Sequence, residues 1–277
     1  MTTVVEQMLT RYPRDTDAQT AHALREVMQE IALAGLNRGG FFEKAAFYGG
    51  TCLRIFYGLP RFSEDLDFSL LKADPAFRLT PYFAALRQEF AALGFEVEIT
   101  EKQKTAVTDI ASAFLKKSSS LYDIKINGQR ALKIKFEVDT EPPQGFLTEQ
   151  KLLLQPYSFY VNCFALPDLY AGKIHALLFR KWKNRVKGRD WFDFEWYVRQ
   201  SAALNLGHFA ERARQSGHWR GETLGQQEFL AMLQDRIATL DVESARSDVL
   251  PFVREPAGLA IWSKDYFVQL AERIRFA

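Results

Sequence analysis

Two aspartates separated by one residue are the first candidates for chemistry. Asp65 and Asp67 lie in residues 61–68, which read RFSEDLDF. If residues 65–70 form a strand, side chains two apart share a face, and the two carboxylates lie side by side. Adjacent carboxylates resist ionising together, and a hard divalent cation removes that conflict. The pair therefore predicts a site for Mg²⁺ or Mn²⁺, although a solvated strand face has the same pattern.

A pair of glycines lies shortly before the aspartates. Gly49 and Gly50 follow a short apolar run, residues 45–48, and precede a predicted helix over 51–57 with Thr51 near its N-cap. Glycine lets backbone N–H groups approach a phosphate closely, and a helix N-terminus favours anions. Nucleotidyl transfer needs such a turn to hold a triphosphate, beside carboxylates that hold metal ions. A Gly-Gly pair alone is more often a plain turn, and its proximity to the aspartates favours the functional interpretation.

A third carboxylate is available on another predicted strand. In residues 134–139, Lys135, Glu137 and Asp139 share one face, and the apolar residues share the other. Glu137 is the predicted third metal ligand and Asp139 is the reserve. The alternative is an exposed polar face of an edge strand.

Basic residues later in the chain could meet phosphates. Lys173, in a predicted helix over 168–182, has apolar neighbours along which its stem can lie while the ammonium reaches a phosphate; the alternative is a surface lysine. A basic stretch follows, with Trp182 available for base stacking, and it suits RNA or is simply solvated. Its members are Arg180, Lys181, Lys183, Arg185, Lys187 and Arg189.

Two further acids lie one turn apart in a predicted helix over 190–200. Asp190 and Asp193 face the same way on that helix. Asp190 has a second interpretation, as the cap of the helix that would begin there.

Hydrophobic periodicity predicts an α+β protein. Helices are expected over 18–37 and over 81–93 with Thr80 as N-cap, and strands over 66–71, 95–100, 124–126, 132–138 and 161–165, with an Asn127-Gly128 turn. No strand pattern follows residue 200. We expect a mixed β-sheet core with flanking helices and a helical lead-in over residues 1–165, and a C-terminal helical bundle over 166–277 that closes the cleft.

Composition limits the class of protein. The chain has 277 residues, of which 47% are hydrophobic and 25% charged, as in a folded globular protein. The net charge is +2, so binding of nucleic acid must depend on a local patch. Cys52 and Cys163 match no zinc spacing and are expected to be buried, reduced thiols. No signal peptide or membrane-spanning run is found, which predicts a cytoplasmic protein without a membrane partner.

The chain resembles the AbiEii/AbiGii-type nucleotidyltransferase toxins of the DNA polymerase β-like superfamily. Five blocks match in order: FYGGTCL at 47–53, RFSEDLD at 61–67, LKIKFEV at 132–138, LPDLYAGKIHAL at 166–177 and KGRDWFDF at 187–194. The resemblance implies that Asp65 and Asp67 bind the metal and that Lys173 contacts the triphosphate. Asp190 or Asp193 would complete the site. The residues assigned to the nucleotide are Gly49, Gly50, Thr51, Arg61, Ser63 and Lys173.

The resemblance also implies a function. The family's members are toxins of toxin–antitoxin or phage-defence systems, so a nucleoside triphosphate, RNA (tRNA in particular) and a cognate antitoxin are the expected partners. The expected reaction transfers a nucleoside monophosphate to RNA. One alternative is nucleotidylylation or phosphorylation of a protein, and another is a catalytically silent module that binds RNA or an antitoxin.

Overall fold

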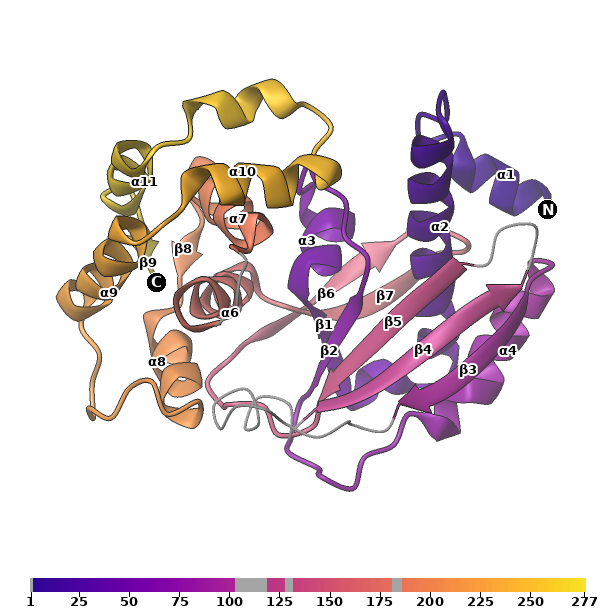
Figure 1. Cartoon of the computed structure of the whole chain (residues 1–277). Coiled ribbons are helices and arrows are strands. Elements are labelled where there is room, and N and C mark those ends of the chain that lie inside the picture. Colours follow the sequence, from indigo (N-terminus) through magenta and orange to yellow (C-terminus); the bar gives the residue numbers. More distant parts are fainter. Residues whose placement is uncertain (1, 103–118, 128–131, 181–185) are drawn as a thin grey trace.

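The core of the protein is a mixed seven-stranded β-sheet (Figure 1). This computed structural model describes residues 2–102, 119–127, 132–180 and 186–277. The strand order is β3-β4-β5-β2-β1-β7-β6. The strands are β1 (Ala45–Tyr48), β2 (Leu66–Leu70), β3 (Glu96–Lys102), β4 (Ser119–Asn127), β5 (Leu132–Asp139), β6 (Thr148–Leu153) and β7 (Phe159–Phe164).

The centre of the sheet separates an apolar face from an acidic one. Strand β2 runs antiparallel to β1 and parallel to β5. Phe68 of β2 is buried with its ring centroid 5.2 Å from that of Phe47 and 5.9 Å from that of Phe136. Because side chains alternate along a strand, Asp67 and Glu137 lie on the opposite face. Burial of the phenylalanines therefore determines where the carboxylates point.

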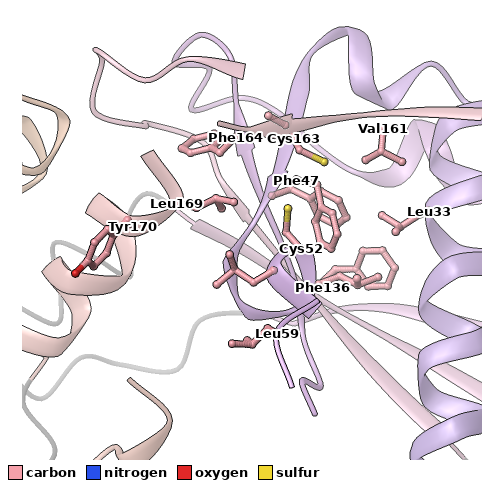
Figure 2. Packing of buried hydrophobic residues seen from close by; sticks show 14 of the residues in the cluster. Leu33, Phe47, Cys52, Leu59, Phe136, Val161, Cys163, Phe164, Leu169 and Tyr170 are labelled. Atoms are coloured by element: carbon pink, nitrogen blue, oxygen red, sulfur yellow. The ribbon is translucent and has the colours of Figure 1, made fainter. Parts of the chain in front are cut away.

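Helices cover the sheet and continue beyond it. The first half contains α1 (Thr3–Leu9), α2 (Asp17–Arg38), α3 (Gly49–Tyr57), α4 (Phe83–Ala92) and the 3₁₀ turns η1 (Phe41–Glu43) and η2 (Thr80–Tyr82). Helix α2 begins with a capping box between Thr16 and Gln19. Its buried face includes Leu33, which lies in the same core as Phe47, Phe136 and Val161 in Figure 2.

After residue 165 the described elements are mainly helical. They are α6 (Leu166–Phe179), α7 (Gly188–Arg199), α8 (Leu206–Gln215), α9 (Gln226–Ala238), α10 (Val242–Val249), α11 (Lys264–Ala271), and the 3₁₀ turns η3 (Leu250–Phe252) and η4 (Pro256–Ile261). Figure 1 shows this group beyond α3, on the side away from α2. The division into two domains at residue 165 stays a prediction.

The predicted α+β architecture is confirmed, with corrections at several elements. Helix α3 begins at Gly49 after Tyr48, so Thr51 lies inside the helix and does not cap it. Thr80 opens a 3₁₀ turn, and α4 begins only at Phe83. Helix α7 begins at Gly188, so Asp190 is in its first turn and is not the N-cap.

Strands were also missed. Strand β6 lies at the edge of the sheet, and its sequence TEQKLL is too polar to signal a strand. The expectation of no strand after residue 200 is wrong, because β8 (Ala203–Leu204) and β9 (Arg275–Phe276) form a short parallel pair. Of the predicted Asn127-Gly128 turn, Gly128 falls outside the described residues.

Two other expectations concern thiols and membranes. Cys52 and Cys163 are both buried, free thiols, as predicted, and Figure 2 shows them in the same part of the core. Among the helices that the structure describes, none is both long and apolar enough to span a bilayer.

Candidate nucleotidyl transfer site

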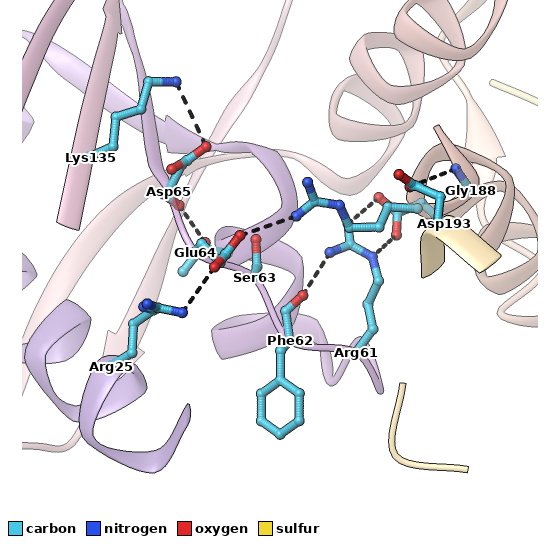
Figure 3. A network of polar contacts seen from close by, with 12 residues as sticks. Arg25, Arg61, Phe62, Ser63, Glu64, Asp65, Lys135, Gly188 and Asp193 are labelled. Atoms are coloured by element: carbon cyan, nitrogen blue, oxygen red, sulfur yellow. Dashed lines mark hydrogen bonds and ion pairs between the residues drawn. The ribbon is translucent and has the colours of Figure 1, made fainter. Parts of the chain in front are cut away.

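Three carboxylates gather on one face of β2 and β5. Asp67 lies directly opposite Glu137 in the parallel register, and Asp65 precedes β2 by one residue. The ammonium of Lys135 lies between the carboxylates of Asp65 and Glu137. Its Nζ donates to Glu137 Oε2 at 3.1 Å and is 3.7 Å from Asp65 Oδ2, the contact drawn in Figure 3. The carboxylate pair and its predicted third member are thus neighbours in space.

Burial and mutual repulsion make ionisation of Asp65 and Asp67 unfavourable. Burial, with added repulsion from Glu137 and Asp65, raises the pKa of Asp67 to about 7. Burial also raises the pKa of Asp65, although Lys135 opposes this. A bound cation would favour ionisation of both groups.

The donor chemistry of this face suits a hard divalent ion. Asp65, Asp67 and Glu137 offer oxygen ligands only, as Mg²⁺ prefers. Within the described ranges, however, no three acidic, histidine or cysteine side chains already stand close enough together to hold a metal ion. The residues fit a metal by type and by strand register, and side-chain rotations would have to bring them together.

The glycine pair packs tightly against the same face. Gly49 has φ +82°, and an added Cβ would overlap Asp67 Oδ2. An added Cβ at Gly50 would lie 2.8 Å from Ser63 Oγ and 3.4 Å from Lys173 Nζ. Helix α3 starts at these glycines, so its N-terminus lies beside the Ser63 hydroxyl and the Lys173 ammonium. A helix N-terminus beside an ammonium favours a phosphate.

Lys173 is held in place by a buried ion-pair network. Its Nζ is 2.8 Å from Asp193 Oδ2, and Arg61 contacts both oxygens of Asp193 at 2.6 Å. Figure 3 shows this forked contact of Arg61 with Asp193. Burial alone would raise the pKa of Asp193, but the two cations outweigh it and hold that pKa below its usual value. Asp193 therefore stays ionised and orients Lys173.

Two residues assigned to the nucleotide have structural contacts. Arg61 is buried, and its guanidinium is occupied by Asp193 and by the carbonyl of Phe62. The hydroxyl of Thr51 donates to the carbonyl oxygen of Asp65. These contacts favour structural roles for both residues. Arg61 packs beside Gly50, and the hydrogen bond of Thr51 connects α3 to the residue before β2.

The basic stretch does not form one described patch. Lys181, Lys183 and Arg185 lie outside the described residues, and Arg180 is exposed just after α6.

The end of the stretch joins two parts of the chain. Arg189 lies over the ring of Phe252, 4.0 Å from its centroid, and its Nη1 is 3.8 Å from Glu64. Arg25 of α2 also pairs with Glu64, at 2.9 Å. Arg189 thus links α7 to the segment that carries the aspartates, and neighbouring Asp190 is buried close to Arg61.

One cation near the site had no sequence signal. Arg212 of α8 lies beside α6, with its guanidinium 3.9 Å from where a Cβ on Gly172 would be. Its Nε is buried and has no acceptor among the described residues. The charge of Arg212 also counteracts the rise that burial causes in the pKa of Asp139. An incompletely paired guanidinium beside the carboxylate face is a candidate anion ligand.

Three carboxylates on or beside the neighbouring strands β2 and β5, with a glycine turn that opens α3, are the arrangement expected of a nucleotidyltransferase. The family model described as nucleotidyl transferase AbiEii toxin, type IV toxin–antitoxin system, matches residues 31–270. Because the match covers most of the chain, the protein belongs to this family, as the resemblance of its motifs predicted.

Solved structures share the fold. MenT4, a nucleotidyltransferase toxin from Mycobacterium tuberculosis H37Rv, superposes with a TM-score of 0.56 at 17% identity, covering 98% of this chain and 87% of that one. JHP933 from Helicobacter pylori superposes with a TM-score of 0.53 at 16% identity, and the match covers 91% of this chain and 90% of that one. No curated protein sequence is significantly similar. At such low identity the structural likeness concerns the fold alone.

Proposed function

We propose that the protein transfers a nucleoside monophosphate from a nucleoside triphosphate to a hydroxyl of RNA, with tRNA as the acceptor and a divalent cation, Mg²⁺ or Mn²⁺, as cofactor. The acceptor oxygen bonds to the α-phosphorus, the bond from that phosphorus to the bridging oxygen breaks, pyrophosphate leaves and the hydroxyl proton passes to solvent. When bound, the cation would neutralise negative charge on the phosphates.

One observation carries the proposal: Lys173 is fixed at the glycine turn beside a carboxylate with a raised pKa. Its Nζ is held by buried Asp193, lies next to Gly50, and attracts the charge of Asp67. A surface lysine would have none of these constraints. These constraints support a role for the Lys173 ammonium in binding a triphosphate whose phosphates lie at the start of α3.

The roles of the chain's residues follow from their positions. Asp65, Asp67 and Glu137 hold the cation. The backbone of Gly49 and Gly50, together with the Ser63 hydroxyl, binds phosphate oxygens. Arg212 binds a phosphate of the nucleotide from the side of α8, because its guanidinium lacks an acceptor for Nε in the described part of the chain.

Biological partners follow from the family. We propose a cognate antitoxin, action within a toxin–antitoxin system with an effect on phage growth, and a cytoplasmic location. We also propose that Arg180, Lys181, Lys183, Arg185 and Lys187 of the basic stretch bind RNA, and of these the structure describes Arg180 and Lys187.

The test incubates purified protein, MgCl₂ and total tRNA with each α-labelled nucleoside triphosphate in turn. Asp67→Ala is compared with Glu98→Ala, which removes an exposed carboxylate of β3 at a distance from the site. Label on tRNA with the wild type and Glu98→Ala, and none with Asp67→Ala, is the expected result. Label on a protein band would favour protein nucleotidylylation, and RNA binding without transfer would favour a silent binding module.

A further inference from the structure

The ammonium of Lys135 occupies the space between two of the proposed metal ligands. Strand β5 places it there by its backbone: Lys135 is two residues before Glu137 on the same face, and the β2–β5 register brings it beside Asp65. The side chains of Lys135 and Asp65 are 35% and 47% exposed, so this contact is reachable from solvent. A metal ion bound by Asp65, Asp67 and Glu137 would meet the same ammonium.

We propose that Lys135 is the resident counter-ion of this site. It neutralises Asp65 and Glu137 in the free protein, weakens the binding of a free divalent cation, and makes tight cation binding depend on the nucleotide. The inference rests on the proposed function only in taking these carboxylates as the metal site.

The argument is electrostatic and geometric. A lysine ammonium is a compact charge on a flexible stem. The ammonium of Lys135 can therefore rotate away from the carboxylates while its backbone stays in β5. For a half-exposed, screened site, the repulsion between one unit charge and a divalent ion a few ångströms away corresponds to about tenfold in the dissociation constant. A triphosphate brings negative charge of its own. Lys135 can then turn to a phosphate oxygen while the carboxylates take the cation.

A second lysine provides a matched control. Lys151 on edge strand β6 pairs with Glu149 at 3.1 Å, two residues apart on one strand, which repeats the geometry of Lys135 and Glu137. Lys151→Met therefore removes a lysine from an equivalent strand pair far from the proposed ligands in the sheet order.

The experiment measures Mn²⁺ binding by electron paramagnetic resonance without nucleotide and then with a non-hydrolysable triphosphate analogue. Lys135→Met should bind Mn²⁺ about tenfold more tightly than the wild type without nucleotide. Lys135→Arg, which keeps the charge, and Lys151→Met should bind like the wild type. The analogue should improve Mn²⁺ affinity more in the wild type than in Lys135→Met. Thermal melts confirm that each variant is folded.

The outcomes separate the inference from the proposed function. If Lys135→Met and the wild type bind Mn²⁺ equally while Asp67→Ala binds it weakly, Lys135 is not the counter-ion and the metal site stands. If folded wild type and Lys135→Met bind no Mn²⁺, with or without the analogue, both ideas are overturned.

Discussion

The buried pair between Arg61 and Asp193 gives the sharpest prediction about stability. The side chains are 2% and 0% exposed, and two contacts of 2.6 Å join the guanidinium to the carboxylate. The change Asp193→Asn keeps the shape of the side chain and removes its charge. It removes the hydrogen-bonded counter-ion of buried Arg61 and also the ion-pair partner of Lys173.

The expected loss is large for one substitution. Breaking a buried ion pair by removing one partner costs about 3–5 kcal/mol, because the other charge stays buried. Since 1 kcal/mol shifts the melting temperature of a domain of this size by about 2–4 °C, Asp193→Asn should melt roughly 6–20 °C lower. Activity should also fall, because the ammonium of Lys173 is no longer oriented.

Urea unfolding followed by circular dichroism, at pH 7 and without nucleotide, measures the free energy of unfolding. The control is Glu243→Gln, which removes one partner of an exposed ion pair with Arg246; the Glu243 side chain is 79% exposed. Exposed pairs contribute at most about 1 kcal/mol. If Asp193→Asn lowers the free energy of unfolding no more than Glu243→Gln does, the structural role given to this pair is wrong.

Three other changes test the site. Gly49→Ala should reduce transfer at least about tenfold and lower stability by about 1–3 kcal/mol, since φ is positive there and the methyl group would displace Asp67; unchanged activity with unchanged melting would refute the packing argument. Because burial and Glu137 raise the pKa of Asp67 to about 7, the folded protein binds that proton more tightly than the unfolded chain, and the metal-free protein should lose stability as pH rises from about 4 to 7. The loss is at most about 4 kcal/mol, and Asp67→Asn should flatten it in urea melts at pH 5 and pH 8. Arg212→Gln should weaken binding of a fluorescent triphosphate about tenfold, whereas Arg214→Gln, which removes a cation already paired with Glu211, should not; equal affinities would exclude Arg212 from the nucleotide site.

Local patterns predicted the elements that bear the carboxylates. Alternation in residues 134–139 predicted that Glu137 lies on the polar face of its strand. The Asp-x-Asp spacing predicted the same for Asp67. The pairing of Asp67 with Glu137 needs the register of two strands that are far apart in the chain. No periodicity within either strand carries that information.

The role of Arg61 shows a different limit. The family resemblance assigned Arg61 to the nucleotide, and that assignment stays a prediction. Its partner Asp193 is 132 residues away, and only the tertiary fold brings the two together. Arg212 was missed for the same reason, because an arginine on an amphipathic helix has no local signal of what it faces.

The central claim is that these residues transfer a nucleoside monophosphate to RNA. The direct test compares α-labelled with γ-labelled nucleoside triphosphate, using tRNA, Mg²⁺ and either wild type or Asp67→Ala. The account predicts that only the α label reaches tRNA, that pyrophosphate forms in equal amount, and that Asp67→Ala abolishes both. Transfer of the γ label, or α labelling that persists in Asp67→Ala, would contradict it.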